Sequence, residues 1–359
     1  MTITDAHLYR YRLPLTDPLS VGERTLTERE GLLLCLQDSG GREGWGEAAP
    51  LPGFSEASLG DVLEHGRRLA ELLVGVEVSV SERNTLLGSL PEADLHASVQ
   101  FAGEGALVEL GAAVRGISVL DLLGGGDESV ALNALITDDC SDLVEAAENI
   151  RKNGYRAAKL KVGRRDISAD VARVRRVHAA LNGEVSLRLD ANRAWTVEEA
   201  TTFAEEVGEL SLAYVEEPLA DPTALPGLVE ATGLPVALDE TTREGDPGEL
   251  PDDYPIRAVI LKPTLLGGIT PTRAWTRWAE RREAVPVVSA SYESGVGLRM
   301  LAALASSLPS APAGLSTYSR LAADVLLPRP PIEGPNVQLP DLYAARVDRS
   351  AVHARSTTS

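Results

Sequence analysis

Short apolar runs of about four to seven residues recur along the chain from about residue 129, and each is followed by a helix-like segment. The runs are rich in Leu and β-branched residues and read VALNALI, YRAAKLKV, VSLRLD, LAYVEEP, LPVALDE, IRAVILKP and VPVVSAS. Continuous apolar strands that alternate with amphipathic helices indicate a parallel sheet covered by helices. Seven or eight such units in about 190 residues predict a (β/α) barrel, and no Gly-x-Gly-x-x-Gly motif of a doubly wound sheet follows these strands.

A polar residue closes each successive strand of this pattern. The intervals between these residues are 29, 26, 23, 23 and 27, the size of one strand–helix unit, and the residues are Lys161, Asp190, Glu216, Asp239, Lys262 and Ser289. In a barrel the loops after the C-terminal strand ends build the active site, so we expect all six around one mouth. Strand alternation places Lys159 on the face of Lys161, and Arg188 on the face of Asp190 and beneath it.

Three carboxylates from three strands predict a metal site. Like charges so close together are costly unless a cation neutralises them. No His or Cys accompanies Asp190, Glu216 and Asp239, and an all-oxygen set suits Mg²⁺ before Ca²⁺ or Zn²⁺. Three carboxylates leave coordination positions for water and for a substrate carboxylate.

Lysine is scarce in this chain, with four copies among 34 basic residues. Three of the four, Lys159, Lys161 and Lys262, fall at the expected mouth. A catalytic base must lose its proton, which Arg cannot do in a protein and Lys can when burial or neighbouring cations lower its pKa. A metal flanked by lysines is suited to removal of a proton α to a carboxylate, with the ion stabilising the enediolate.

Each element of this pattern also has a simpler explanation. A Lys-x-Lys pair is usually solvated, Asp190 suits a loop before a helix, and Glu-Glu-Pro often only ends a strand. The scarcity of Lys is also explained by a composition bias of the source genome. The shared register of all six residues in consecutive units favours the functional interpretation. A non-catalytic binding relative would be free to replace Lys161 or Lys262 with Arg, and this chain has not done so.

The N-terminal part does not repeat the strand–helix pattern of the barrel. Residues 2–13 and 32–37 and the segment REGWGEA read as strands, and 56–73 and 96–114 have helical periodicity. We expect a small α+β domain over residues 1–95, with a mobile loop at 17–30, and a barrel over 96–312. A C-terminal segment at 313–343 and a frayed polar tail at 344–359 complete the expected organisation.

Composition limits the possible partners. The formal net charge is −19 and the pI about 4.7, a field that repels nucleic acids and anionic lipid surfaces. No apolar run approaches the roughly 20 residues that cross a bilayer. The start, MTITDAHLYRYRLPL, alternates like a strand rather than a signal peptide, and Cys35 and Cys140 are far apart. We therefore expect a cytoplasmic protein without disulfides, with a monomer slightly favoured.

The motifs KLK (159–161), RLDAN (188–192), VEEP (215–218), LDE (238–240) and VILKP (259–263) resemble the enolase superfamily, in the branch with lysines on both sides of the metal. Chemistry with a Lys or His base and Mg²⁺ is known for this superfamily. Longer segments are similar to the o-succinylbenzoate synthase family of menaquinone biosynthesis: GWGEAAPLPGFS, RLDANRAWT, VILKPTLLGG, SASYESGVGL and GLSTYSRLAADVL. The resemblance covers nearly the whole chain, to about residue 326.

The resemblance implies a (β/α)7β modified TIM barrel under an α+β capping domain. It implies Mg²⁺-dependent syn dehydration of a dicarboxylate, 2-succinyl-6-hydroxy-2,4-cyclohexadiene-1-carboxylate, to 2-succinylbenzoate. By position, Lys161 is the base, and Lys262 stabilises the enolate by cation–π attraction. Lys159 lowers the pKa of Lys161. The other implied roles are Asp190, Glu216 and Asp239 for Mg²⁺, Arg188 and Asn192 beside metal and substrate, and Ser289, Ser291 and the backbone near Gly314 for the succinyl tail. The loop at 17–30 would close over the site.

Two related activities remain open. An N-succinylamino acid racemase or a dipeptide epimerase needs both Lys161 and Lys262 to titrate, and both are present. An epimerase usually carries Asp-x-Asp in the last barrel loop, whereas this chain reads SASYESG. A muconate-type cycloisomerase is disfavoured because the strand motif is Glu-Glu-Pro rather than Glu-Gln-Pro.

Overall fold

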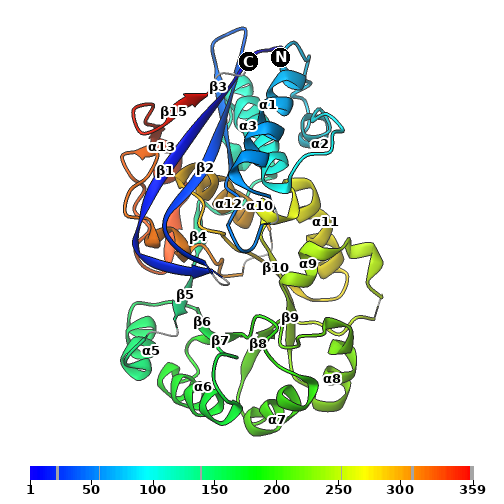
Figure 1. The fold of residues 1–359 in the computed structure, drawn as a ribbon, viewed down its shortest axis with the longest axis vertical. Helices are drawn as coiled ribbons and strands as arrows, with labels where there is room; N and C mark the ends of the chain where they lie inside the picture. Colours follow the sequence, from blue (N-terminus) through cyan, green and yellow to red (C-terminus); the bar gives the residue numbers. More distant parts are fainter. Residues whose placement is uncertain (22–23, 56, 138–139, 252, 309–310, 356–359) are drawn as a thin grey trace.

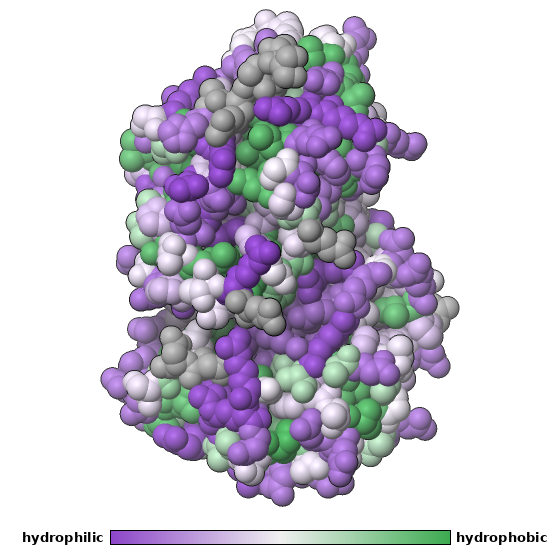
Figure 2. Space-filling view, viewed as in Figure 1, coloured by the Kyte–Doolittle hydropathy of each residue, from purple (hydrophilic) through white to green (hydrophobic). Residues whose placement is uncertain are grey.

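The computed structural model describes residues 1–355 except 22–23, 56, 138–139, 252 and 309–310. Two parts lie one above the other in Figure 1, an N-terminal sheet with its helices and a ring of parallel strands with outer helices. No helix in the described ranges combines the length and apolarity needed to cross a bilayer. The face in Figure 2 is dominated by hydrophilic residues, with hydrophobic ones in small separate groups.

The upper part, the cap, is built on an antiparallel sheet with strand order β15-β1-β2-β3. Its strands are β1 (Ile3–Val21), β2 (Arg24–Asp38), β3 (Glu43–Ala48) and β15 (His353–Arg355). Its helices are α1 (Leu59–Leu73), α2 (Arg83–Leu87), α3 (Ala97–Arg115) and α4 (Val119–Leu123). Helix α3 packs so closely on β3 that a Cβ added at Gly46 would lie 1.8 Å from the carbonyl oxygen of Ala102. Only glycine permits that approach. Helix α3 therefore packs on the cap sheet, whereas we expected the barrel to begin at residue 96.

The lower part contains a seven-stranded parallel sheet with strand order β11-β10-β9-β8-β7-β6-β5. The strands are β5 (Asn133–Ile136), β6 (Ala157–Lys161), β7 (Ser186–Asp190), β8 (Leu212–Glu216), β9 (Val236–Leu238), β10 (Ala258–Leu261) and β11 (Val285–Val288). The helices between and after them are α5 (Leu143–Lys152), α6 (Ile167–Leu181), α7 (Val197–Val207), α8 (Leu225–Thr232), α9 (Glu240–Glu244), α10 (Pro263–Leu266), α11 (Ile269–Glu280) and α12 (Gly295–Ser306). The expectation of a modified TIM barrel with a capping domain is confirmed.

Residues 313–314 close the ring between its first and last strands. Ala313 forms a parallel bridge with Leu132, and Gly314 forms one with Ser289. We expected the barrel to end at residue 312, but two residues beyond that point complete it, because their backbone groups satisfy the free edges of β11 and of the chain before β5.

Two segments differ from the sequence-based expectations. Within the expected loop at 17–30, residues 17–21 and 24–30 extend the β1–β2 hairpin, with Leu19 opposite Leu26 and Ser20 opposite Thr25, and positions 22–23 lie outside the described residues. The segment 344–359, expected as a frayed tail, contains β15, which pairs with β1, and β14 (Arg346–Val347), which pairs with β12 (Leu326–Leu327). Positions 356–359 of that segment lie outside the described residues. The remaining elements, β13 (Asn336–Gln338) and α13 (Leu339–Ala344), run back along the cap, and β13 pairs with β4 (Ser129–Ala131).

Candidate active site

The six strand-end residues meet at one mouth of the ring. Parallel pairing aligns Lys161 with Asp190, and Asp190 with Glu216, on three adjacent strands. Asp239 follows β9 and Lys262 follows β10 directly. Because the carboxyl ends of parallel strands lie at one edge, residues far apart in the sequence come within hydrogen-bonding distance.

Lysine ammonium groups lie between the carboxylates. Lys159 Nζ is 2.7 Å from Asp190 Oδ2 and 2.8 Å from Glu216 Oε1. Lys161 Nζ lies 2.6 Å from the same Asp190 oxygen, and Lys262 contacts Asp239 Oδ2. The three carboxylate side chains are at most 2% exposed, whereas the side chain of Lys161 is 27% exposed. Lys161 is therefore the most accessible of the three lysines.

Burial and charge act in opposite directions on these groups. Burial raises the pKa of Asp190, but the charges of Lys159 and Lys161 outweigh it and hold that pKa well below its usual value. Burial, with the nearby charge of Asp190, raises the pKa of Glu216 to about 8. Burial lowers the pKa of Lys159, but the surrounding carboxylates outweigh it and raise this pKa well above the usual range. Burial also lowers the pKa of Lys262, and Asp239 and Glu216 reverse that effect so that its pKa is raised.

The chemistry of the donor set fits a hard divalent cation. Glu216 Oε2 and Asp239 Oδ1 are buried and have no hydrogen-bond partner among the residues that the structure describes, so an oxygen of each remains free to bind a cation. Within the residues that the structure describes, no three His, Cys, Asp or Glu side chains are grouped as a recognisable metal site. The donor types and their unpaired oxygens are thus the evidence for a cation here.

Asn192 and Arg188 take different positions. Asn192 Oδ1 accepts a hydrogen bond of 2.5 Å from Lys161, and Asn192 Nδ2 donates to Glu240 over 3.2 Å. Arg188 is 5% exposed and donates to Asn133 Oδ1 over 2.9 Å and to the carbonyl of Pro312 over 2.7 Å. These hydrogen bonds hold the side chain of Arg188 inside the ring, next to residues 313–314, which close it.

The expected tail-binding residues lie where the ring closes. Ser289 Oγ donates to the carbonyl of Gly314 over 3.3 Å. A Cβ added at Gly314 would lie 2.5 Å from that hydroxyl, so glycine is required for this contact. The hydroxyl of Ser291 is buried and has no partner within the described part of the chain, which leaves it free for a ligand.

Comparison with known proteins identifies the family. The Enolase C-terminal domain-like model matches residues 142–343, and the model described as MenC, N-terminal domain matches residues 3–109. An o-succinylbenzoate synthase of Salmonella paratyphi C (strain RKS4594) is 34% identical over 90% of this chain and 94% of its own length. An o-succinylbenzoate synthase of Pasteurella multocida (strain Pm70) is 32% identical over 94% of this chain and 96% of its own length. The chain belongs to the o-succinylbenzoate synthase family of the enolase superfamily.

Solved structures of the enolase superfamily share this fold. The L-Ala-D/L-Glu epimerase from Bacillus subtilis, in a substrate-liganded complex, is 25% identical with a TM-score of 0.82 over 97% of this chain and 98% of that one. A dipeptide epimerase from Cytophaga hutchinsonii, complexed with Mg and D-Ala-L-Val, is 23% identical with a TM-score of 0.83 over 99% of both chains. At that identity the second comparison supports the fold alone.

Sequence reasoning missed cap residues that reach the mouth of this o-succinylbenzoate synthase family member. The ring of Phe54 lies 5.9 Å from Lys262 Nζ and 5.1 Å from the guanidinium of Arg243. Arg29 is 1% exposed and donates to the carbonyls of Tyr292, Pro50, Ala49 and Ser291 over 2.9–3.4 Å. Phe54 is part of the segment GWGEAAPLPGFS, whose resemblance to the family is the signal in the sequence that points to it.

Glu217 was also missed. This buried side chain accepts from the backbone N–H of Asp239 over 2.9 Å and of Thr241 over 2.7 Å, and from Arg193 over 3.1 Å. It therefore holds the start of the β9–α9 connection that carries Asp239. In the sequence, the signal that points to Glu217 is its place as the second Glu of the Glu-Glu-Pro motif.

Proposed function

We propose that this chain catalyses the o-succinylbenzoate synthase reaction, the syn dehydration of 2-succinyl-6-hydroxy-2,4-cyclohexadiene-1-carboxylate to 2-succinylbenzoate. Relatives with that name are 32–34% identical over at least 90% of the chain. The observation that carries the proposal is the position of Lys161, accessible at the mouth and 2.6 Å from a carboxylate of the expected metal set.

Lys161 supplies both proton transfers. Its free amine takes the proton from the carbon α to the substrate carboxylate, and the electron pair of that C–H bond moves toward the carboxylate. The C–O bond on the adjacent carbon then breaks, and the ammonium of Lys161 returns the proton to the departing hydroxide, which leaves as water. One residue serves both steps because both reacting groups lie on the same face of the ring in a syn elimination.

Asp190, Glu216 and Asp239 are the residues we propose for Mg²⁺. Carboxylate oxygens are the ligands this ion prefers, and two of them lack partners. When bound, the ion supplies positive charge against the second negative charge that develops on the substrate carboxylate. Its charge would also offset the carboxylates that raise the pKa values of Lys159 and Lys262.

The other residues orient the substrate. Lys262, four strands away from Lys161 in the sheet order, would face the opposite side of the substrate ring as a cation. The unpaired hydroxyl of Ser291, with Ser289 and the Gly314 backbone, would bind the succinyl tail. Phe54 would cover the mouth from the cap and exclude water.

A second activity is favoured by one observation. Lys161 and Lys262 each contact a different carboxylate, Asp190 and Asp239, and the strands β6 and β10 that carry or precede them lie four apart in the sheet order. Racemisation of N-succinyl amino acids needs acid–base groups on both sides of the α carbon, so a side activity of this type is consistent with the site.

One experiment separates the two reactions. Purified protein with Mg²⁺ is incubated with the cyclohexadiene substrate, whose absorbance loss is followed, and in parallel with N-succinyl amino acids in D₂O. Rapid dehydration is the expected result, with any α-deuterium exchange slower. Absence of dehydration together with clear exchange would replace the synthase assignment by the racemase.

A further inference from the structure

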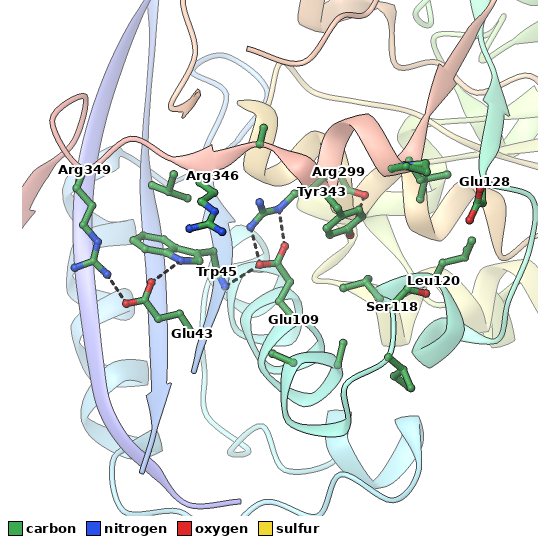
Figure 3. A pocket seen from close by; sticks show the side chains of 18 residues that line it. Glu43, Trp45, Glu109, Ser118, Leu120, Glu128, Arg299, Tyr343, Arg346 and Arg349 are labelled. Atoms are coloured by element: carbon green, nitrogen blue, oxygen red, sulfur yellow. Dashed lines mark hydrogen bonds and ion pairs between the residues drawn. The ribbon is translucent and has the colours of Figure 1, made fainter. Parts of the chain in front are cut away.

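A cavity separate from the active-site mouth lies on the flank of the cap, with a volume of about 840 Å³. It lies between α3 and α4 on one side and α13 and β14 on the other, with Trp45 of β3 and Arg299 of α12 at one end (Figure 3). None of the residues proposed for the active site lines it. The volume falls within the range of about 300–1,000 Å³ that is usual for small-molecule sites.

The walls of this cavity are largely apolar. One wall is formed by the end of α3 and the start of α4, and the other by the first turn of α13. The apolar residues are Ala112, Ala113, Ile117, Val119 and Leu120 on the first wall and Leu339 and Pro340 on the second. Such walls favour a ligand with a hydrophobic body.

The two acidic groups at the Trp45 end are already neutralised. Glu109, 9% exposed, receives two hydrogen bonds of 2.6 Å from Arg299 and one of 3.0 Å from the backbone of Trp45. Glu43 pairs with Arg349 and accepts from the indole N–H of Trp45 over 3.2 Å. The guanidinium of Arg349 also lies 5.5 Å from the Trp45 ring, so the indole is held in place.

Arg346 brings a third guanidinium to the same end. Its backbone is fixed by pairing with Leu327 in the β12–β14 ladder. Figure 3 shows its side chain directed toward Trp45 and the Glu109–Arg299 pair. Among the described residues no ion pair or side-chain hydrogen bond engages Arg346, so this end has a surplus positive charge in a chain of net charge −19.

We propose that this cavity binds a small aromatic carboxylate, with its carboxylate on Arg346 and its ring system between Trp45 and the apolar walls. A guanidinium offers two parallel donors that match a carboxylate, and an indole edge or face suits an aromatic ring. Arg299 lies in the second turn of α12, the helix that follows the loop of Ser289 and Ser291. The bound ligand would therefore bridge the cap to the helix behind the active-site loop, without entering the mouth.

The test uses 2-naphthoate as the probe, titrated calorimetrically into the full chain, with uncharged 2-naphthamide as its matched analogue. We expect saturable binding of one 2-naphthoate per chain. We expect binding about 10- to 100-fold weaker for the amide, and for 2-naphthoate with Arg346→Gln, since one charge-assisted pair is lost. Arg175→Gln, an exposed arginine on α6, is the control and should bind 2-naphthoate unchanged.

Two further measurements keep the proposal testable if Arg346→Gln perturbs the fold. Ala113→Trp, at an exposed wall position, keeps every charge and should weaken binding by filling the cavity. Lys262→Gln removes one positive charge at the active-site mouth, outside the cavity, and should bind 2-naphthoate unchanged. Absence of saturable binding, equal affinity in Arg346→Gln, or weakened binding in Lys262→Gln would overturn the proposal. A dimer that dissociates in Arg346→Gln would also overturn it, because the cavity would then be an interface between copies.

Discussion

Lys159 and Lys161, two residues apart on β6, both donate to the same oxygen, Oδ2 of Asp190, over 2.7 and 2.6 Å. Alternation along β6 places both side chains on the inner face of the ring, and the β6–β7 register brings Asp190 opposite Lys161. Lys159 bridges onward to Glu216, whereas Lys161 reaches Asn192. Lys159 therefore links two carboxylates, whereas the more exposed Lys161 remains available to a substrate.

Lys161→Arg should abolish dehydration while the fold is kept. Arg retains the charge but cannot become a neutral base, so we expect a loss of about 10²- to 10⁴-fold in kcat. Initial rates followed by absorbance measure the dehydration, and circular dichroism checks the fold. Lys152→Arg makes the same replacement on α5, where the side chain is 60% exposed, and should leave the rate unchanged. Full activity in Lys161→Arg would contradict the base assignment.

Mg²⁺ should stabilise the chain through Glu216. A ligand that binds only the folded state stabilises it by about 2.7 kcal/mol at a hundredfold excess over Kd. Thermal unfolding of the chelator-treated protein should therefore shift upward with Mg²⁺, and Glu216→Gln should lose most of that shift. Glu148→Gln changes an exposed carboxylate on α5 and serves as control. An equal Mg²⁺ shift in Glu216→Gln would rule out this carboxylate as a ligand.

Gly314→Ala should distort the ring closure. The added methyl group would lie 2.5 Å from Ser289 Oγ and 3.2 Å from its Cβ, so Ser289 must move. We expect a destabilisation of about 1–3 kcal/mol in urea unfolding, and a raised KM. Gly227→Ala, in α8 with open space around the new methyl group, should instead stabilise by about 0.5–1 kcal/mol. Unchanged stability and KM in Gly314→Ala would show that the closure tolerates a side chain.

Arg29→Met should loosen the contact between the cap and the loop of Ser291. It leaves buried carbonyls without donors, and each such group costs about 1–3 kcal/mol. We expect the free energy of unfolding to fall by at least about 3 kcal/mol and KM to rise. Arg24→Met replaces an exposed arginine at the start of the same strand and should change neither. Wild-type KM in Arg29→Met would mean that the active-site loop is held by other contacts.

Glu47 should make stability depend on pH below neutrality. Burial raises the pKa of Glu47 from 4.5 to about 6 in the folded chain, against hydrogen bonds from Ser294 and Tyr11 that lower it. Between these values the folded chain binds a proton that the unfolded chain does not, so this contribution to stability increases as pH falls from about 6 to 4.5. A pKa shift of that size changes the free energy of unfolding by about 2 kcal/mol. This pH-dependent change should be absent in Glu47→Gln. Denaturant unfolding of both proteins at pH 7, 6 and 5 measures the difference. A constant difference across this range would contradict the raised pKa.

The strand-end residues could be predicted because their signals are local. Each apolar run ends at a polar residue, and the interval to the next is one strand–helix unit, so Lys161, Asp190 and Glu216 share a position whatever the details of packing. The hairpin arms at 17–21 and 24–30 could not be predicted, because their polar composition resembles a loop and their structure depends on pairing across the hairpin. The same holds for β15, whose three residues pair with β1 at the other end of the chain.

The amino-acid sequence alone determined the barrel class, the order of the strands that carry the chemistry, and which side chains end them, since these follow from periodicity and spacing along the backbone. Only the tertiary structure decided which carboxylate oxygen each lysine contacts, that Arg188 braces the interior, that residues 313–314 close the ring, and that Phe54 and Arg29 reach the mouth from the cap. Those contacts join segments far apart in the chain, and their geometry is set by packing between elements rather than by the pattern within any one of them.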